Sequence, residues 1–116
     1  MSYNVLSLRQ HVTSNVLQTP PAVDVSRSVD VRGFNAARFD LVVLNSDETL
    51  TAVVQGSDDL ESWTTLATLG TTFAIGFALP AAVTGIAVSY LRLSYSVGGE
   101  GFSFAIVAAG VNLANL

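Results

Sequence analysis

The sequence predicts an all-β protein, a single antiparallel β-sandwich of jelly-roll type with about eight strands and an extended N-terminal arm. Three observations lead to this fold class. Most of the chain consists of short segments in which apolar and polar residues alternate, a period of two that suits half-buried strands. Residues that favour turns separate these segments at intervals of about 8–12 residues, as in sandwiches. No stretch sustains the period of an amphipathic helix.

The composition predicts one domain that assembles with other chains. Of the 116 residues, 50% are hydrophobic and 12% are charged, whereas soluble domains usually carry about 25% charged residues. A chain with so few charges is expected to cover part of its surface by contact with other subunits. The net charge is −4 and lysine is absent, so no basic stripe is available and we expect no binding to nucleic acid.

Residues 1–20 form a first unit, and residues 21–116 form the predicted sandwich. The apolar residues of the first unit keep neither a helical nor a strand period, and Pro20-Pro21 ends it with a stiff, extended step. Two interpretations follow with equal weight. The unit is either an arm that lies across a neighbouring subunit or the first strand of the same sandwich.

Three strands are predicted before the middle of the chain. Residues 22–26 and 28–32 alternate apolar with polar residues, which indicates strands with one face in water. Their aspartates lie near Arg27 and Arg32, an arrangement that suggests charge matching between strands. Residues 37–45 begin with alternation and end as a continuous apolar run, which is typical of a central strand.

Residues 49–66 predict a β-hairpin. Residues 49–55 alternate as a strand, and Gly56 to Asp59 form the turn, because glycine tolerates unusual backbone angles and Ser and Asp bond to their own backbone. The β-branched and aromatic residues of 62–66 suit the returning strand. This hairpin places Trp63, the single tryptophan, just beyond the turn.

Part of the chain resembles the small β-sandwich structural proteins of tailed-phage particles. The motifs that carry this resemblance are Val54 to Asp59 (VQGSDD) with Trp63, the segment Tyr90-Leu91-Arg92-Leu93, and the glycine-rich stretch 98–104. The resemblance implies a virion structural protein of decoration, cement or spike type. A weaker resemblance is to discoidin-like, galactose-binding sandwiches, which share the tryptophan hairpin and the arginine strand. That second resemblance implies a carbohydrate-binding module.

Three residues follow from the weaker resemblance as candidates for carbohydrate binding. Trp63 and Tyr90 would stack on a sugar ring, and Arg92 would bond to its hydroxyl groups. A simpler interpretation of the same residues is favoured. In it, Trp63 fills the core beside the hairpin, and Arg92 pairs with an acid such as Asp40 or Glu61.

The segment after the hairpin predicts a subunit contact. Large side chains alternate with Ala74, Gly76 and Ala78, so a strand over residues 73–79 would have one smooth face. The C-terminal residues carry no charge and are expected to pack against this subunit or its neighbour. The predicted interface residues are Phe73, Ile75, Phe77, Leu79, Val111, Leu113 and Leu116. A membrane-spanning helix over residues 73–91 is disfavoured, because glycine and proline interrupt the run and its flanks lack a basic cluster.

The sequence predicts no catalytic residue, metal site or cofactor. Cysteine and lysine are absent, and His11 is the single histidine and accompanies no nucleophile motif. Asp58, Asp59 and Glu61 could offer oxygen atoms to calcium, but they lack the spacing of a calcium loop. We expect these acids to form a turn with solvated charges.

These observations predict a non-enzymatic virion structural protein that self-assembles and binds a repeating protein shell. The expected partners are copies of the same chain, with a trimer favoured, and other capsid proteins; no membrane partner is expected. The expected location is the virion, after assembly in the host cytoplasm. The alternative is a carbohydrate-binding sandwich that uses the loop tip near Trp63.

Overall fold

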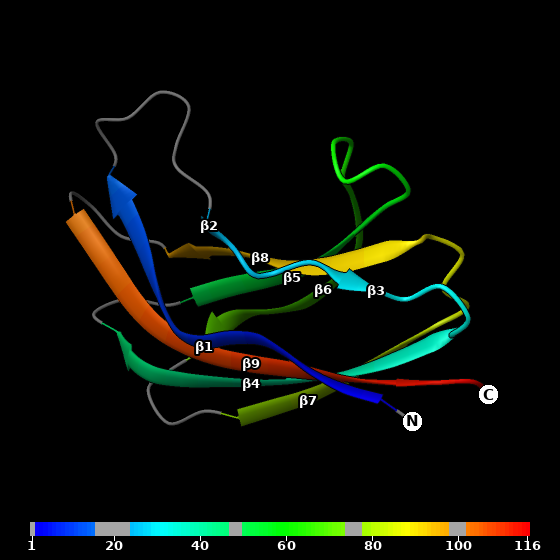
Figure 1. Cartoon of the computed structure of the whole chain (residues 1–116). Coiled ribbons are helices and arrows are strands. Elements are labelled where there is room, and N and C mark those ends of the chain that lie inside the picture. The colour runs from blue at the N-terminus through cyan, green and yellow to red at the C-terminus, as the bar shows by residue number, and fades with distance from the viewer. Residues whose placement is uncertain (1, 16–23, 47–49, 74–77, 98–101) are drawn as a thin grey trace.

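The computed structural model describes residues 2–15, 24–46, 50–73, 78–97 and 102–116. These residues form nine strands and no helix, arranged as two antiparallel sheets that pack face to face (Figure 1). The predicted all-β sandwich is therefore confirmed. The strands are β1 (Ser2–Asn15), β2 (Asp24–Val25), β3 (Val29–Asp30), β4 (Ala36–Ser46), β5 (Leu50–Ser57), β6 (Thr64–Phe73), β7 (Ala78–Thr84), β8 (Tyr90–Val97) and β9 (Phe102–Ala114).

The strand order is that of a jelly roll. The first sheet has the order β1-β9-β4-β7, and the second has the order β2-β8-β5-β6, with β3 also paired to β8. The short strands β2 and β3 pair with different parts of β8 and so act as one interrupted strand. Each sheet therefore has four strand positions, and chain neighbours such as β4 and β5 lie in opposite sheets, as in the double Greek key of jelly rolls.

The core lies between the inner faces of the two sheets. On β4, Phe39 and Leu41 are at most 1% exposed, and on β8, Leu93 and Tyr95 are 0% exposed. These residues alternate with outward-facing neighbours along each strand, because successive side chains of a strand point to opposite sides. The period of two in the sequence thus corresponds to burial on one side of each sheet.

Strand β1 contains residues 2–15 of the N-terminal unit and pairs with β9 of the same chain, from Ser2 opposite Leu113 to Asn15 opposite Phe102. Residues 16–20 lie outside the described residues. The register shifts between Val5 and Ser7 and again between Ser7 and Gln10. Such bulges place extra residues in a strand and disturb its alternation, which explains why this unit shows no clean period.

A buried polar cluster ties the bulged part of β1 to the second sheet. The hydroxyl oxygens of Ser7 and Tyr95 lie 2.9 Å apart, and Ser7 Oγ donates to Gln10 Oε1 at 2.7 Å. Gln10 Nε2 in turn donates to the carbonyl of Val25 at 2.6 Å. Burial raises the pKa of Tyr95 to about 12. The cluster satisfies its polar atoms inside the sandwich and fixes the bulge of β1 relative to β2 and β8.

The segment after the hairpin differs from the prediction in two ways. First, Gly70-Thr71-Thr72 indicates a turn in the sequence, but these residues are part of β6, which continues to Phe73 opposite Leu50, because threonine is β-branched and suits a strand. A single strand over residues 73–79 is also wrong, since Phe73 ends β6 in the second sheet and Leu79 lies in β7 of the first. No helix among the described residues is long and apolar enough to cross a membrane.

Candidate functional site

The first candidate surface is the outer face of the second sheet, where the three predicted carbohydrate-binding residues lie. On β8, Tyr90 and Arg92 alternate with the fully buried Leu91 and Leu93, so both point away from the core. Trp63 precedes β6, the strand at the edge of this sheet, and is partly exposed. We call this surface the polar face.

Arg92 and Trp63 form a stacked pair on the polar face. The guanidinium carbon of Arg92 lies 4.0 Å from the centroid of the Trp63 ring, which is a cation–π contact. Arg92 Nε donates to Gln55 Oε1 at 2.8 Å, because β5 pairs with β8 and places Gln55 directly opposite. Trp63 Nε1 donates to the carbonyl of Leu60 at 3.2 Å.

This pair corrects the simpler interpretation of these residues. Trp63 does not fill the core, and the hydrogen-bond partner of Arg92 is an amide rather than Asp40 or Glu61. The physical reason is that the register of β5 and β8 places the Gln55 amide opposite Arg92, while the Trp63 ring stacks on the guanidinium. Partial burial lowers the pKa of Arg92.

A second aromatic stack lies beside the first. The guanidinium carbon of Arg32 lies 5.6 Å from the centroid of the Tyr90 ring, and Arg32 also pairs with Asp30 at 2.6 Å. Hydrogen bonds from the side chain and backbone of Arg32 lower the pKa of Asp30 to about 2. The expected charge matching is therefore present, but the two charges lie in one short segment rather than on neighbouring strands.

The acidic turn uses its carboxylates to hold its own backbone. Asp59 Oδ1 accepts hydrogen bonds from the backbone N–H of Ser62 at 2.8 Å and of Glu61 at 2.9 Å, and these bonds lower the pKa of Asp59. Asp58 Oδ1 accepts from the backbone N–H of Ser89 at 2.9 Å. A hollow of about 250 Å³ lies between this turn and Val88. Among the described residues, no three His, Asp or Glu side chains gather as metal ligands would.

The second candidate surface is the outer face of the first sheet, which we call the apolar face. Its exposed side chains alternate with core residues along β4 and β9, and strand β1 covers one side of it. Tyr3 lies over Gly110, where a Cβ atom would overlap the tyrosine hydroxyl. Large hydrophobic side chains are exposed on its strands, namely Tyr3 (58%), Val5 (41%), Leu8 (77%) and Leu44 (41%).

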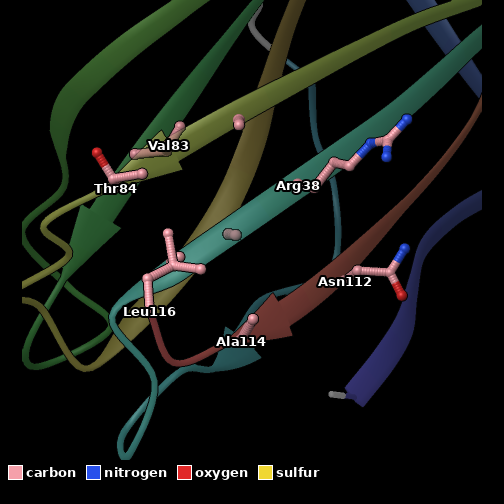
Figure 2. A pocket seen from close by; sticks show the side chains of 9 residues that line it. Arg38, Val83, Thr84, Asn112, Ala114 and Leu116 are labelled. Atoms are coloured by element: carbon pink, nitrogen blue, oxygen red, sulfur yellow. The ribbon is translucent and has the colours of Figure 1, made fainter.

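Two shallow hollows lie on the apolar face. One, of about 230 Å³, is lined by Ala36, Ala82, Ala114 and other residues, and the side chain of Leu116 borders it (Figure 2). The other, of about 210 Å³, is lined by small and apolar residues of β1, β4 and β9. Arg38 borders the first hollow and Asp40 borders the second. A pair of opposite charges thus separates two largely apolar depressions.

The predicted interface residues do not gather on one surface. Val111 is 0% exposed and Leu113 is 1% exposed, so both fill the core of this chain and cannot contact a neighbour. They are buried because the residues of β9 that alternate from Ala105 to Leu113 face the second sheet. Leu116 is 85% exposed beside the first hollow. Phe73 and Leu79 lie on strands of different sheets, as described above, and Ile75 and Phe77 lie outside the described residues.

The residue pattern in the sequence does not single out the exposed apolar residues of β1 and β4. Tyr3 and Val5 are exposed and Leu6, the next residue, is buried, as alternation along a strand predicts. The bulges after Val5 and Ser7 then shift the register, so the alternation does not continue along β1. Leu44 lies where the pairing of β4 with β9 also shifts, between Val43 and Asn45. Irregular register therefore concealed the apolar face.

Comparisons with known proteins identify a similar fold but no family. No protein-family model matches the chain, and no curated protein matches it. Among solved structures, the chain is similar to a chain in the structure of infectious bursal disease virus, Gt strain, with a TM-score of 0.61 and 8% sequence identity. The alignment covers 98% of this chain and 33% of that chain, so the present chain spans about a third of its neighbour's length. The sandwich as a whole thus has the fold of a segment of a protein in a virus structure.

Proposed function

We propose that this protein is a non-enzymatic structural protein of a virus particle. The observation that carries the proposal is the match of 98% of the chain, at a TM-score of 0.61, to a chain in a virus structure. Two further observations support it. Charged residues make up only 12% of the chain, and large apolar side chains are exposed together on one face.

The proposed mechanism is assembly through surface burial. Each contact between subunits removes apolar area from water, which stabilises it by about 25 cal/mol per Å². Charged and polar side chains at the contact fix the orientation of the subunits. Attachment of an oligomer to a repeating shell makes several modest contacts act together, so the assembly would dissociate slowly.

The finer role that we propose is a decoration, cement or spike-base subunit located in the virion after assembly in the host cytoplasm. This role rests on the resemblance of Val54 to Asp59, Trp63 and Tyr90 to Leu93 to structural proteins of tailed phages. Its partners would be further copies of the chain and other capsid proteins.

Purification of virus particles from the source of the sequence tests the proposal. The expected result is that the chain sediments with intact particles at a fixed ratio to the shell protein, as measured by quantitative mass spectrometry. A chain that stays in the soluble fraction while particles form normally would refute the virion role.

A second candidate function, carbohydrate binding, is favoured by the position of Trp63, Tyr90 and Arg92 on one face. Jelly rolls also include lectin domains. Against this candidate, Arg92 already stacks on the Trp63 ring and bonds to Gln55, so a sugar would have to share or displace these contacts.

A glycan array separates the two candidates. A carbohydrate-binding module would bind a defined set of glycans and lose this binding in Trp63→Ala, but keep it in the matched control Tyr3→Ala on the opposite face. A structural subunit would show no glycan binding that depends on Trp63.

A further inference from the structure

We infer that the apolar face binds the same face of a second copy of this chain. In this dimer the two β4 strands lie antiparallel across a two-fold axis, and Arg38 of each copy contacts Asp40 of the other. The inference rests on charges that find no partner within the described residues and on the shape of the face.

Arg38 and Asp40 lie two residues apart on the same side of β4, and neither makes an ion pair with the other or with another described residue. Both side chains point outward, because they flank the fully buried Phe39 on β4. The strands beside them place Asn112 and Ala82 next to Arg38, and Gly110 next to Asp40. Within the described residues, the one ion pair joins Arg32 to Asp30 in the other sheet, and no hydrogen bond reaches Arg38 or Asp40.

The order of these charges selects one orientation of the two copies. A two-fold axis that passes between the positions of Arg38 and Asp40, across the strands, brings each guanidinium onto the carboxylate of the other copy. If the strands ran parallel about an axis along β4, Arg38 would instead meet Arg38. Opposite charges across an interface fix register, and like charges there cost several kcal/mol, so the antiparallel orientation is favoured.

The same rotation brings parts of the two hollows together. It places Ala36 and Ala114 over Val42 and Ala108 of the second copy, because these pairs lie equally far from the axis along the strands. The two hollows therefore face each other where they lie over β4 and β9. A strongly exposed leucine borders each hollow, Leu116 at 85% and Leu8 at 77%. Each copy thus offers the apolar side chains and the depressions that an isologous contact requires.

The strands of the apolar face are long. The molecule measures 42 × 29 × 19 Å along its principal axes, and the strands of the first sheet run along the long direction of the sandwich (Figure 1). A specific interface buries about 800 Å² on each partner, so the proposed contact has to extend along these strands well beyond Arg38 and Asp40. The small side chains of Ala82 and Ala108 on this face allow the two sheets to approach closely, whereas Gly110 is covered by Tyr3.

This inference deepens the proposed function, because it names the contact by which subunits would assemble. Its biological role rests on the proposed function, but the existence of the dimer does not. The dimer is measured on the isolated chain, without virus particles. A chain that is monomeric but sediments with virus particles would overturn the dimer and support the virion role. A chain that forms the dimer but does not sediment with particles would support the dimer and overturn the virion role.

Charge reversal tests the contact. We expect light scattering over a range of concentrations to give twice the monomer mass of 12.1 kDa for the unchanged chain. Arg38→Asp and Asp40→Arg each place like charges across the axis, so each variant should weaken the dimer at least about tenfold. The double variant R38D/D40R should recover the dimer, and an equimolar mixture of the two single variants should form a heterodimer.

The controls separate loss of contact from loss of fold. Both side chains lie on an outward face, so the circular dichroism spectrum should be unchanged in every variant and unfolding should stay cooperative, although the single variants should unfold at a lower temperature because they lose the stabilisation by dimer formation. The matched control Arg32→Asp reverses an exposed charge on the polar face and should leave the mass unchanged. A monomer at all concentrations, a trimer, or single variants that fail to pair with each other when mixed would overturn the inference.

Discussion

The two outer faces of this sandwich accommodate their side chains in opposite ways. On the polar face, each stacked arginine finds its partners within the chain, since Arg92 contacts Trp63 and Gln55, and Arg32 contacts Tyr90 and Asp30. On the apolar face, hydrophobic side chains are exposed, and the charges beside the hollows meet small or neutral neighbours. The two faces therefore differ in how their side chains are paired. The arginines of the polar face have partners within the chain, whereas the apolar face exposes hydrophobic side chains to solvent.

Both faces depend on one shared core, and breaking that core gives the largest expected effect. Phe39 is 0% exposed and lies on β4 between the outward-facing Arg38 and Asp40. Phe39→Ala should lower the free energy of unfolding by about 3–5 kcal/mol, because it removes buried area and leaves a cavity. Urea unfolding measures the loss. The matched control Val42→Ala, on the outward side of the same strand, should cost far less, and equal losses would contradict this assignment of inner and outer sides.

The loss of stability at alkaline pH should depend on the buried tyrosine of β8 and not on the outward-facing one. Tyr95 has its pKa raised from 10.0 to about 12 by burial. Its neutral form therefore stabilises the fold fully below pH 10, and this contribution of about 2–3 kcal/mol is lost as pH rises through 12. Tyr95→Phe should remove this part of the alkaline loss in urea unfolding. The control Tyr90→Phe, on the outward side of β8, should keep it, and a Tyr95→Phe profile equal to that of the unchanged chain would contradict the prediction.

Removal of the stacked tryptophan tests whether the contacts of the polar face lie within one chain only. Trp63→Ala deletes the cation–π contact with Arg92 and should lower the free energy of unfolding by about 0.5–1 kcal/mol, the usual value at exposed sites. The mass in solution should not change, because the contact lies within one chain. A shift in oligomer mass in this variant would show that the polar face, too, contacts other subunits.

The smallest expected effect is a change in the pKa of one carboxyl group, that of Asp30. Arg32→Gln removes the hydrogen bonds that hold the pKa of Asp30 at about 2, so the value should rise toward its ordinary 3.8 in a titration followed by NMR. Because the folded-state pKa is lowered, the contribution of this pair is present above pH 3.8 and is lost as pH falls through 2. The pair is exposed, so we expect stability at neutral pH to stay unchanged. An unmoved pKa would show that another group holds the carboxylate.

Much of the fold could be predicted, because alternation reports which side of a strand is buried. Apolar and polar residues alternate over residues 90–97, a pattern that predicts a strand, and β8 covers the same residues. The hairpin of β5 and β6 and the central strand β4 were also predicted. Pairing between distant segments was not, since β9 lies between β1 and β4 and no local signal states this order.

The candidate surfaces were harder to predict than the strands. The sequence singled out Trp63 and Arg92, but their contact with each other depends on the register of β5, β6 and β8. The lack of charge in the C-terminal segment predicts that Val111 and Leu113 contact a neighbour, but strands of the core share this property, and both residues lie in the core. The apolar face combines bulged strands from both ends of the chain, so it becomes visible only in three dimensions.

The pairing of the first strand with the last determines how this molecule would respond to force. Ser2 lies opposite Leu113, and both chain ends lie at the same end of the sandwich (Figure 1). A pull that separates the two ends would load the β1–β9 ladder one pair at a time, because hydrogen bonds of antiparallel strands run across them. Such a ladder peels open rather than shearing as a whole, and the polar cluster of Ser7, Gln10 and Tyr95 would be the first obstacle inside it. A tether at both ends would therefore make this protein mechanically soft, whereas a load spread over its broad faces would leave every ladder intact.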